Sequence, residues 1–329
     1  MSRTRFLVFN ISGLDFGIAF RFAWTLSFHI RNQGLQMTVL ELLNWSTDQL
    51  EQDQIENPRL NAELLLMHSF NLSREGLYVH LHDPLKEKER EAVERLIKRR
   101  ISGEPLQYIV GHQEFWSIDL KVDPRVLIPR PETELLIEQT LFILSEMPLG
   151  RKPSVLEIGT GSGAVATSLA KERKDIFVVA TDISRDALLV AKENARSAGV
   201  LGRIGFVNGN LFDPFRLLRG GQAFDLILSN PPYVDHSEIQ GLSREVRSHE
   251  PIIALDGGKG GLEIYHSIAS QAHCYLRRGG WLLLELGQGQ GGKVTELIER
   301  SGFFSKTQLL PDLSGIERVV KSQRMEGGA

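Results

Sequence analysis

Residues 154–170, SVLEIGTGSGAVATSLA, decide the fold of this chain. A short apolar run leads into three glycines at alternate positions, Gly159, Gly161 and Gly163, and then into an alanine-rich segment. Glycine permits a tight turn and lets a ligand approach the backbone before a helix begins. The stretch therefore predicts a strand, a turn and a helix, in the order found in parallel α/β sheets.

The same strand–helix pattern repeats downstream. Continuous apolar runs, typical of strands buried on both faces, occur at 176–181, 204–209, 224–229 and 281–286. Helical segments separate most of them, and the clearest runs from a Ser184 cap to a Gly199 stop. The last two runs, 303–310 and 316–322, have no helix between them. We expect an α/β, Rossmann-like, mostly parallel sheet with a terminal antiparallel hairpin.

The chain before this unit has a different residue pattern. Residues 38–103 are helical in pattern, with Asn57 as a cap before Pro58 and a solvated basic cluster at 98–100. We expect a small N-terminal helical domain over 37–110.

A connecting segment follows. The alternation in FWSIDLKV, residues 115–122, predicts a half-buried strand. Three prolines then stiffen the following stretch. We expect a strand pair and linker over 111–131 and the α/β domain over 132–323.

Residues 1–36 are aromatic-rich and lack clear periodicity. Asp15, Arg21 and Arg31 divide their apolar stretch into pieces too short to span a bilayer. We interpret 1–36 as a disordered extension with Met37 as the functional start, and a membrane-surface anchor is the alternative.

Composition narrows the class of protein. The 329 residues carry 38 Lys plus Arg against 41 Asp plus Glu, a net charge of −3, whereas proteins that grip duplex DNA are more often basic. A single cysteine, Cys274, excludes an internal disulfide and a multi-cysteine metal site. The nine histidines show no ligand spacing, so we expect no metal.

The glycine turn leaves two ligands open. Gly159-x-Gly161-x-x-Ala164 fits a dinucleotide fingerprint, and Asp182 stands near the distance expected for a ribose-binding acid. A dinucleotide needs its pyrophosphate at the helix N-terminus. S-adenosylmethionine instead brings a sulfonium cation and an amino-acid tail, which an acidic Glu157 suits better.

A second motif, SNPPYVD at 229–235, follows the apolar run 224–228. Two prolines cannot continue a sheet ladder, and the residue before a proline is held in extended geometry. The motif either presents the Asn230 side chain rigidly to a ligand or is a plain turn.

These motifs carry a family resemblance. EIGTGSG, TDIS and SNPPY, in this order, resemble class I S-adenosylmethionine-dependent methyltransferases. GEPLQYIVGHQEFW, VLIPRPETE, EPIIALDGG and PDLSGIERVV resemble the release-factor glutamine N5-methyltransferases of the HemK/PrmC type. The resemblance spans Met37 to about Lys321. Two positions depart from it: Asn210 replaces an acidic residue before Leu211, and Gly260 replaces an aspartate.

The resemblance implies the reaction and its residues. The methyl group of S-adenosyl-L-methionine is transferred to the side-chain amide of the glutamine in the Gly-Gly-Gln motif of bacterial release factors. Asn230, Pro231 and Tyr233 are the expected catalytic residues, and these with Pro232 bind the substrate amide. The expected cofactor contacts are Gly159, Thr160, Gly161, Ser162, Gly163, Asp182, Leu211 and Asn230.

Other functions stay open at this point. A ribosomal-protein glutamine methyltransferase or an adenine-N6 methyltransferase would use the same four motif residues, and a dehydrogenase would use the glycine turn. The non-enzymatic alternative is a nucleoside-binding or release-factor-docking module that has lost activity, which the intact Asn-Pro-Pro-Tyr motif disfavours. The helical region is neither strongly basic nor rich in aromatics, which disfavours nucleic acid. We expect a cytoplasmic monomer without stable nucleic-acid or membrane binding.

Overall fold

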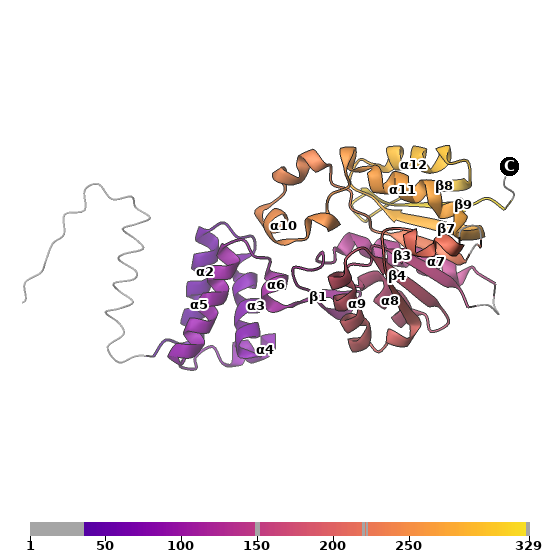
Figure 1. Ribbon diagram of the computed structural model, residues 1–329. Helices are drawn as coiled ribbons and strands as arrows, with labels where there is room; N and C mark the ends of the chain where they lie inside the picture. The colour runs from indigo at the N-terminus through magenta and orange to yellow at the C-terminus, as the bar shows by residue number, and fades with distance from the viewer. Residues whose placement is uncertain (1–35, 149–151, 219–220, 222, 327–329) are drawn as a thin grey trace, which may run out of the picture. The chain divides into compact units, whose positions relative to one another are not determined.

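The computed structural model describes residues 36–148, 152–218, 221 and 223–326 (Figure 1). The chain forms two compact units that divide between Ile101 and Ser102. The prediction for residues 1–36 falls, apart from Gln36, outside the described residues. In the part of the chain that is described, no helix is long and apolar enough to cross a membrane.

The first unit is helical, as predicted. Its helices are α2 (Val39–Gln52), α3 (Pro58–Phe70), α4 (Arg74–Val79) and α5 (Glu87–Ile101). The first begins with a capping box, in which the Thr38 hydroxyl accepts from the Glu41 N–H at 3.3 Å and the Glu41 carboxylate accepts from the Thr38 N–H at 2.9 Å. This reciprocal pair explains why the regular helix starts directly after Thr38.

One detail of the helical prediction is confirmed and one is wrong. Asn57 occupies the cap position of α3 before Pro58, as predicted, in a left-handed conformation (φ 50°) and with no side-chain hydrogen bond to a backbone N–H. Arg100 is not part of a solvated basic face, because it is 6% exposed and donates from Nε to Asn61 Oδ1 at 2.9 Å. Periodicity placed Arg100 at the helix end, but it could not show that a buried amide lies opposite.

The second unit opens with α6 (Leu106–Val110) and an antiparallel pair, β1 (His112–Phe115) and β2 (Ile118–Lys121). The predicted strand pair is present, but the half-buried strand predicted over 115–122 begins only at Ile118, since Trp116 (φ 51°) and Ser117 (φ 53°) form the turn between the two strands. Mirror-image turns of this kind match the twist of a hairpin. Trp116 extends the apolar alternation of β2 backward into the turn, which concealed the turn in the sequence.

A seven-stranded sheet forms the body of the second unit. Its order is β5-β4-β3-β6-β7-β9-β8, with β9 antiparallel to both neighbours and the other pairs parallel. The strands are β3 (Ser154–Ile158), β4 (Phe177–Asp182), β5 (Ile204–Asn208), β6 (Phe224–Ser229), β7 (Leu276–Glu285), β8 (Phe304–Pro311) and β9 (Glu317–Arg324). The predicted parallel sheet and terminal antiparallel hairpin are confirmed.

Helices cover both faces of this sheet (Figure 1). The longer ones are α7 (Glu134–Ser145), α8 (Ala164–Glu172), α9 (Arg185–Ser197), α11 (Glu263–Gln271) and α12 (Gly291–Arg300), with a short α10 (Arg244–His249). Alternate residues of one strand enter opposite cores: Val155 packs with residues of α7, α8 and α9, and Leu156 packs with residues of α11 and α12. Burial on both faces explains the continuous apolar runs.

The strand order positions the site. The chain passes from β3 outward to β4 and β5, then returns to β6 on the other side of β3. Ligands bind at such a switch point, beyond the carboxyl ends of the strands. Gly159, Asp182 and Asn230 stand at the ends of β3, β4 and β6, so the topology brings the three motifs to one edge.

Candidate active site

A cavity of about 570 Å³ opens at this edge of the sheet, within the second unit. Its volume is in the range of small-molecule sites. The predicted site residues that line it are Gly159, Thr160, Gly161, Ser162, Asp182, Leu211, Asn230, Pro231 and Pro232. Gly163 and Tyr233 are not among the described residues that line it.

The glycines of the turn serve two different purposes. A Cβ added to Gly159 (φ 73°) or Gly161 (φ 55°) would meet no atom within 4 Å. These two positions therefore leave open space beside the backbone, which a ligand can fill. A Cβ on Gly163 would lie only 2.8 Å from the Cβ of Ala191, so Gly163 permits close packing of α8 on α9.

Glu157 is buried behind the turn. Its Oε2 accepts from the Thr160 hydroxyl at 2.7 Å and from the Ala166 N–H, in the first turn of α8, at 3.1 Å. Burial raises the pKa of Glu157 to about 8. The protein thus places its own acidic group at the start of α8, where a dinucleotide would place its pyrophosphate.

Asp182 links the glycine turn to α9. Its Oδ2 accepts from the Gly161 N–H at 2.9 Å, and its Oδ1 accepts from the Ser184 N–H at 2.8 Å. Burial raises the pKa of this carboxyl above its usual value. A carboxylate has about four acceptor positions, so two backbone bonds leave capacity for ligand hydroxyls.

Two apolar side chains line the cavity beyond Asp182. Ile183 is 51% exposed and Leu211 has a positive φ of 47°. The sequence pointed to Leu211 but not to Ile183, whose place directly after Asp182 at the strand end is a usable signal. Together they offer surface for a flat apolar group.

The Asn-Pro-Pro segment forms the opposite wall. Ser229 ties β6 to β3 by donating its hydroxyl to the Ile158 carbonyl at 2.7 Å. Asn230 follows, half-buried, and its Nδ2 donates to Thr133 Oγ1 at 3.1 Å. This donor assignment leaves Oδ1 as the acceptor atom of Asn230.

Tyr233 lies behind this wall. Its carbonyl accepts from Gln290 Nε2 at 2.9 Å, and its ring packs so closely that a Cβ on Gly287 would lie 2.9 Å from it. Burial raises the pKa of its hydroxyl. The structure therefore places Tyr233 where it supports the backbone of the motif.

A glycine-rich segment, residues 257–261, lies against the same backbone. Cβ atoms on Gly257 and Gly261 would lie 2.7 Å from the Pro232 carbonyl oxygen and 2.1 Å from the Tyr233 carbonyl oxygen, respectively. Only glycine fits at such distances. This segment, whose first residues were considered above only for the family resemblance, therefore fixes the position of the Asn-Pro-Pro-Tyr motif.

The expected linker is part of the cavity wall. Its lining residues are Arg125, Val126, Leu127, Pro129 and Arg130, and Thr133, two residues beyond the expected linker, also lines the cavity. Glu250 holds this stretch, since its carboxylate pairs with the Arg130 guanidinium and accepts from the Ile128 N–H at 3.3 Å. Sequence reasoning missed these residues as site residues, because a proline-rich connection carries no periodicity that identifies its neighbours.

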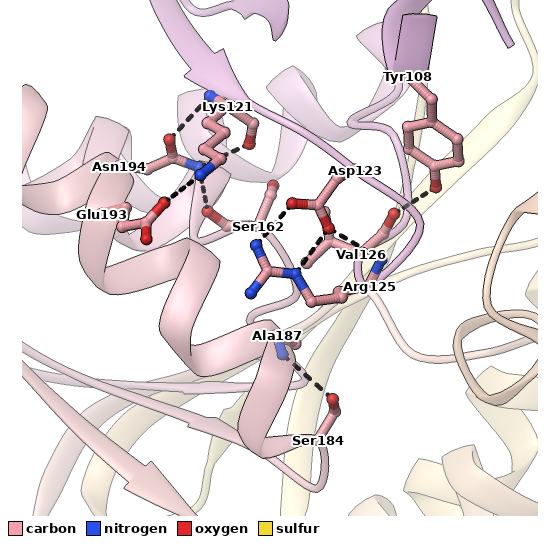
Figure 2. A network of polar contacts seen from close by, with 10 residues as sticks. All are labelled: Tyr108, Lys121, Asp123, Arg125, Val126, Ser162, Ser184, Ala187, Glu193 and Asn194. Carbon is pink, nitrogen blue, oxygen red and sulfur yellow. Dashed lines mark hydrogen bonds and ion pairs between the residues drawn. The ribbon is translucent and has the colours of Figure 1, made fainter. Parts of the chain in front are cut away.

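A polar network joins the hairpin to the glycine turn (Figure 2). The Asn194 side chain accepts from the Lys121 N–H at 2.8 Å and donates to the Lys121 and Ser162 carbonyls at 3.0 and 2.8 Å. Figure 2 also shows Tyr108 donating to the Val126 carbonyl. These bonds attach the wall to the turn across a long sequence separation.

Comparison with known proteins identifies the two units. A family model described as the PrmC N-terminal domain matches residues 41–111, and one described as a methyltransferase small domain matches residues 136–246. Among solved structures, the hMettl16 catalytic domain in complex with MAT2A 3′UTR hairpin 6 is similar, with a TM-score of 0.51 and 16% identity, covering 74% of this chain and 83% of that one. At that identity the likeness shows the fold alone.

Curated relatives are similar over most of their length. The release factor glutamine methyltransferase of Geobacter sulfurreducens is 42% identical over 286 residues, which cover 86% of this chain and 95% of the relative. That of Moorella thermoacetica is 40% identical over 290 residues, which cover 88% and 100%. The chain therefore belongs to the release factor glutamine methyltransferase family.

Proposed function

We propose that this protein transfers a methyl group from S-adenosyl-L-methionine to the side-chain amide nitrogen (N5) of the glutamine in the Gly-Gly-Gln motif of bacterial release factors. One observation carries the proposal: a single cavity contains both the glycine turn with Asp182 and the rigid Asn230-Pro231 wall. The glycine turn with Asp182 suits a nucleoside, and the Asn230-Pro231 wall suits a planar NH₂ group.

The cofactor side of the cavity fits a cationic nucleoside. Gly159 and Gly161 leave space at the backbone, and Asp182 has acceptor capacity for ribose hydroxyls. Ile183 and Leu211 supply apolar surface for the base. Glu157 occupies an N–H at the start of α8, which disfavours a pyrophosphate and therefore a nicotinamide dinucleotide.

The substrate side orients a weak nucleophile. The lone pair of an amide nitrogen is delocalised into its carbonyl, so positioning and charge stabilisation must supply the catalysis. Asn230 Oδ1 and the Pro231 carbonyl accept the two N–H hydrogens and direct the nitrogen into the cavity. When bound, S-adenosylmethionine would supply an electrophilic methyl group on sulfur, with the thioether as the leaving group, and the alkylated nitrogen would release one proton to water.

Mass spectrometry of a release factor incubated with enzyme and cofactor tests the proposal. We expect a gain of one methyl group on the Gly-Gly-Gln glutamine, and no gain on a factor in which that glutamine is replaced. Methylation of a ribosomal protein or of adenine, with the release factor unmodified, would contradict it. Nicotinamide-dependent oxidation without methyl transfer would assign the cavity to a dehydrogenase.

Asp182→Ala should weaken cofactor binding by about 1–3 kcal/mol, the range for loss of a hydrogen-bond partner that carries charge. Asp186, exposed in the first turn of α9, supplies the matched control Asp186→Ala. Titration calorimetry measures both. Equal affinities in the two variants would remove Asp182 from the ribose site.

We further propose that the helical unit binds the body of the release factor, because one tripeptide offers little surface for selectivity. A chain that begins at Ser102 should then lose about tenfold or more in kcat/KM on the intact factor and much less on a short Gly-Gly-Gln peptide. Cofactor affinity checks that the shortened chain is folded. Equal losses on both substrates would contradict this role.

The same proposal includes the cellular setting. A release factor is a cytoplasmic substrate, so we propose that the enzyme acts in the cytoplasm, as a monomer, without stable binding to nucleic acid. Size-exclusion chromatography with light scattering measures the oligomeric state. A stable dimer would contradict the monomer.

A further inference from the structure

Glu285 ends strand β7 directly beside the Asn230 position. Strands β6 and β7 are parallel, with Ser229 opposite Leu284, so Asn230 and Glu285 follow at neighbouring strand ends. Glu285 is 2% exposed, and its Oε2 has no hydrogen-bond partner. A buried carboxyl without full pairing costs stability, so its presence calls for a functional explanation.

The nearest base does not neutralise this carboxyl. Arg318 pairs instead with Asp312 at 3.0 Å and with Glu132 at 3.8 Å. Among the described residues, no basic side chain forms an ion pair with Glu285. Burial raises the pKa of Glu285 to about 7, although the neighbouring Thr133 and Asn230 side chains and the charge of Arg318 act in the opposite direction.

The hydrogen-bonding roles of these three neighbouring side chains depend on one another. An ionised carboxylate only accepts hydrogen bonds, whereas a threonine hydroxyl can donate or accept and an asparagine amide can present either its oxygen or its NH₂ group. If Glu285 accepts from the Thr133 hydroxyl, the Thr133 oxygen must accept from its other neighbour. Asn230 Nδ2 lies 3.1 Å from that oxygen.

We propose that Glu285 and Thr133 are positioning residues, which hold the Asn230 amide with its NH₂ group inward and its Oδ1 atom toward the cavity. This inference rests on the proposed function, in which Oδ1 accepts a hydrogen bond from the substrate amide. Without the carboxylate, the Asn230 amide can rotate by half a turn and present a donor to the substrate NH₂ group, which repels it.

Four variants of the full chain test the inference. Glu285→Gln keeps the shape of the side chain but can donate, so it no longer dictates the direction. Thr133→Val removes the hydroxyl, and Thr133→Ser restores it. The matched control is Asp225→Asn, a buried carboxyl at the opposite end of β6 that accepts from the Ser154 N–H at 2.8 Å.

Each variant is measured for kcat on a Gly-Gly-Gln peptide, for cofactor affinity and for melting temperature. We expect Glu285→Gln and Thr133→Val to lower kcat by about tenfold or more, with cofactor affinity changed by less than about twofold. Thr133→Ser should recover most of the rate. Asp225→Asn should lower only the melting temperature.

The double variant Asn230→Ala/Glu285→Gln distinguishes a failure of the proposed function from a failure of the role assigned to Glu285. If Glu285 acts through Asn230, its replacement adds no further loss once Asn230 is gone. An unimpaired Asn230→Ala enzyme would overturn the proposed function itself. Two outcomes would overturn only this inference. One is an impaired Asn230→Ala enzyme together with normal kcat in Glu285→Gln and Thr133→Val. The other is a double variant whose loss in kcat equals the combined losses of the two single variants.

The pH profile provides a readout that a purely structural role would not change. A protonated Glu285 can donate, so kcat of the wild-type enzyme should fall as the pH drops through about 7. The charged groups that act on this carboxyl are Glu132 and Arg318, and, together with burial, its own charge raises the pKa of Tyr233 and Tyr265. Glu285→Gln should abolish the step, and a step that persists unchanged would contradict the assignment to Glu285.

Discussion

Replacing Asn230 with alanine should lower kcat on the release-factor glutamine by about 10²–10³-fold, the loss typical of removing one group that stabilises developing charge. The hydrogen bond from the substrate N–H strengthens as the nitrogen acquires positive charge, so its removal affects the transition state more than the ground state. Cofactor affinity should change much less. Steady-state kinetics and calorimetry measure the two quantities separately.

Asn230→Asp is the sharper companion of this variant. The carboxylate keeps an acceptor at nearly the same position, but it cannot donate to Thr133 Oγ1 as Asn230 Nδ2 does at 3.1 Å. It also adds charge beside the sulfonium. We expect cofactor affinity to be equal or tighter and kcat to remain low. Full activity in both variants would show that Asn230 does not orient the amide.

Gly261→Ala should reduce both stability and kcat far more than Gly260→Ala. The two residues have the same φ of 67°, so an alanine at either position meets the same backbone penalty of about 1–2 kcal/mol. They differ in their neighbours. A Cβ on Gly261 would lie 2.1 Å from the Tyr233 carbonyl oxygen and 2.7 Å from Gln290 Nε2, whereas a Cβ on Gly260 would meet nothing within 4 Å.

The clash at Gly261 must displace the backbone that carries the Asn-Pro-Pro segment. We expect an extra loss of about 1–3 kcal/mol in the free energy of unfolding relative to Gly260→Ala, the cost typical of overpacking. We also expect kcat to fall by about tenfold or more, because small misplacements of reacting groups reduce rates strongly. Denaturant unfolding and peptide kinetics provide the comparison. Indistinguishable variants would show that residues 257–261 do not position the motif.

Gly260 is also one of the two positions at which the sequence departs from the family pattern. It is the position where the sequence resemblance led us to expect an aspartate, and its N–H donates to Asp235 Oδ2 at 3.0 Å. The backbone bond that holds this loop therefore does not need a side chain at position 260. The departure leaves the loop attached to the segment that follows the motif.

The sequence by itself determined most of the fold of the second unit. Buried parallel strands need continuous apolar runs, and tight turns at a ligand site need glycine. The sequence of residues 154–170 and 224–233 therefore predicts these strands and the glycine turn from local pattern alone. The ends of β3, β4 and β6 meet at one edge once the parallel order is known, so the grouping of Gly159, Asp182 and Asn230 also followed from the sequence.

Only the tertiary structure decided which residues stand behind these motifs. The Trp116–Ser117 turn was concealed because Trp116 extends the apolar alternation of Ile118 and Leu120 backward into the turn. The wall formed by Arg130 depends on Glu250, which is far away in the chain. Thr133, Asn230 and Glu285 also lie far apart in the chain, on three separate segments, and only the fold brings them together. Local pattern encodes the conformation of each segment, whereas the partner of a buried polar group is set by sheet register and helix packing.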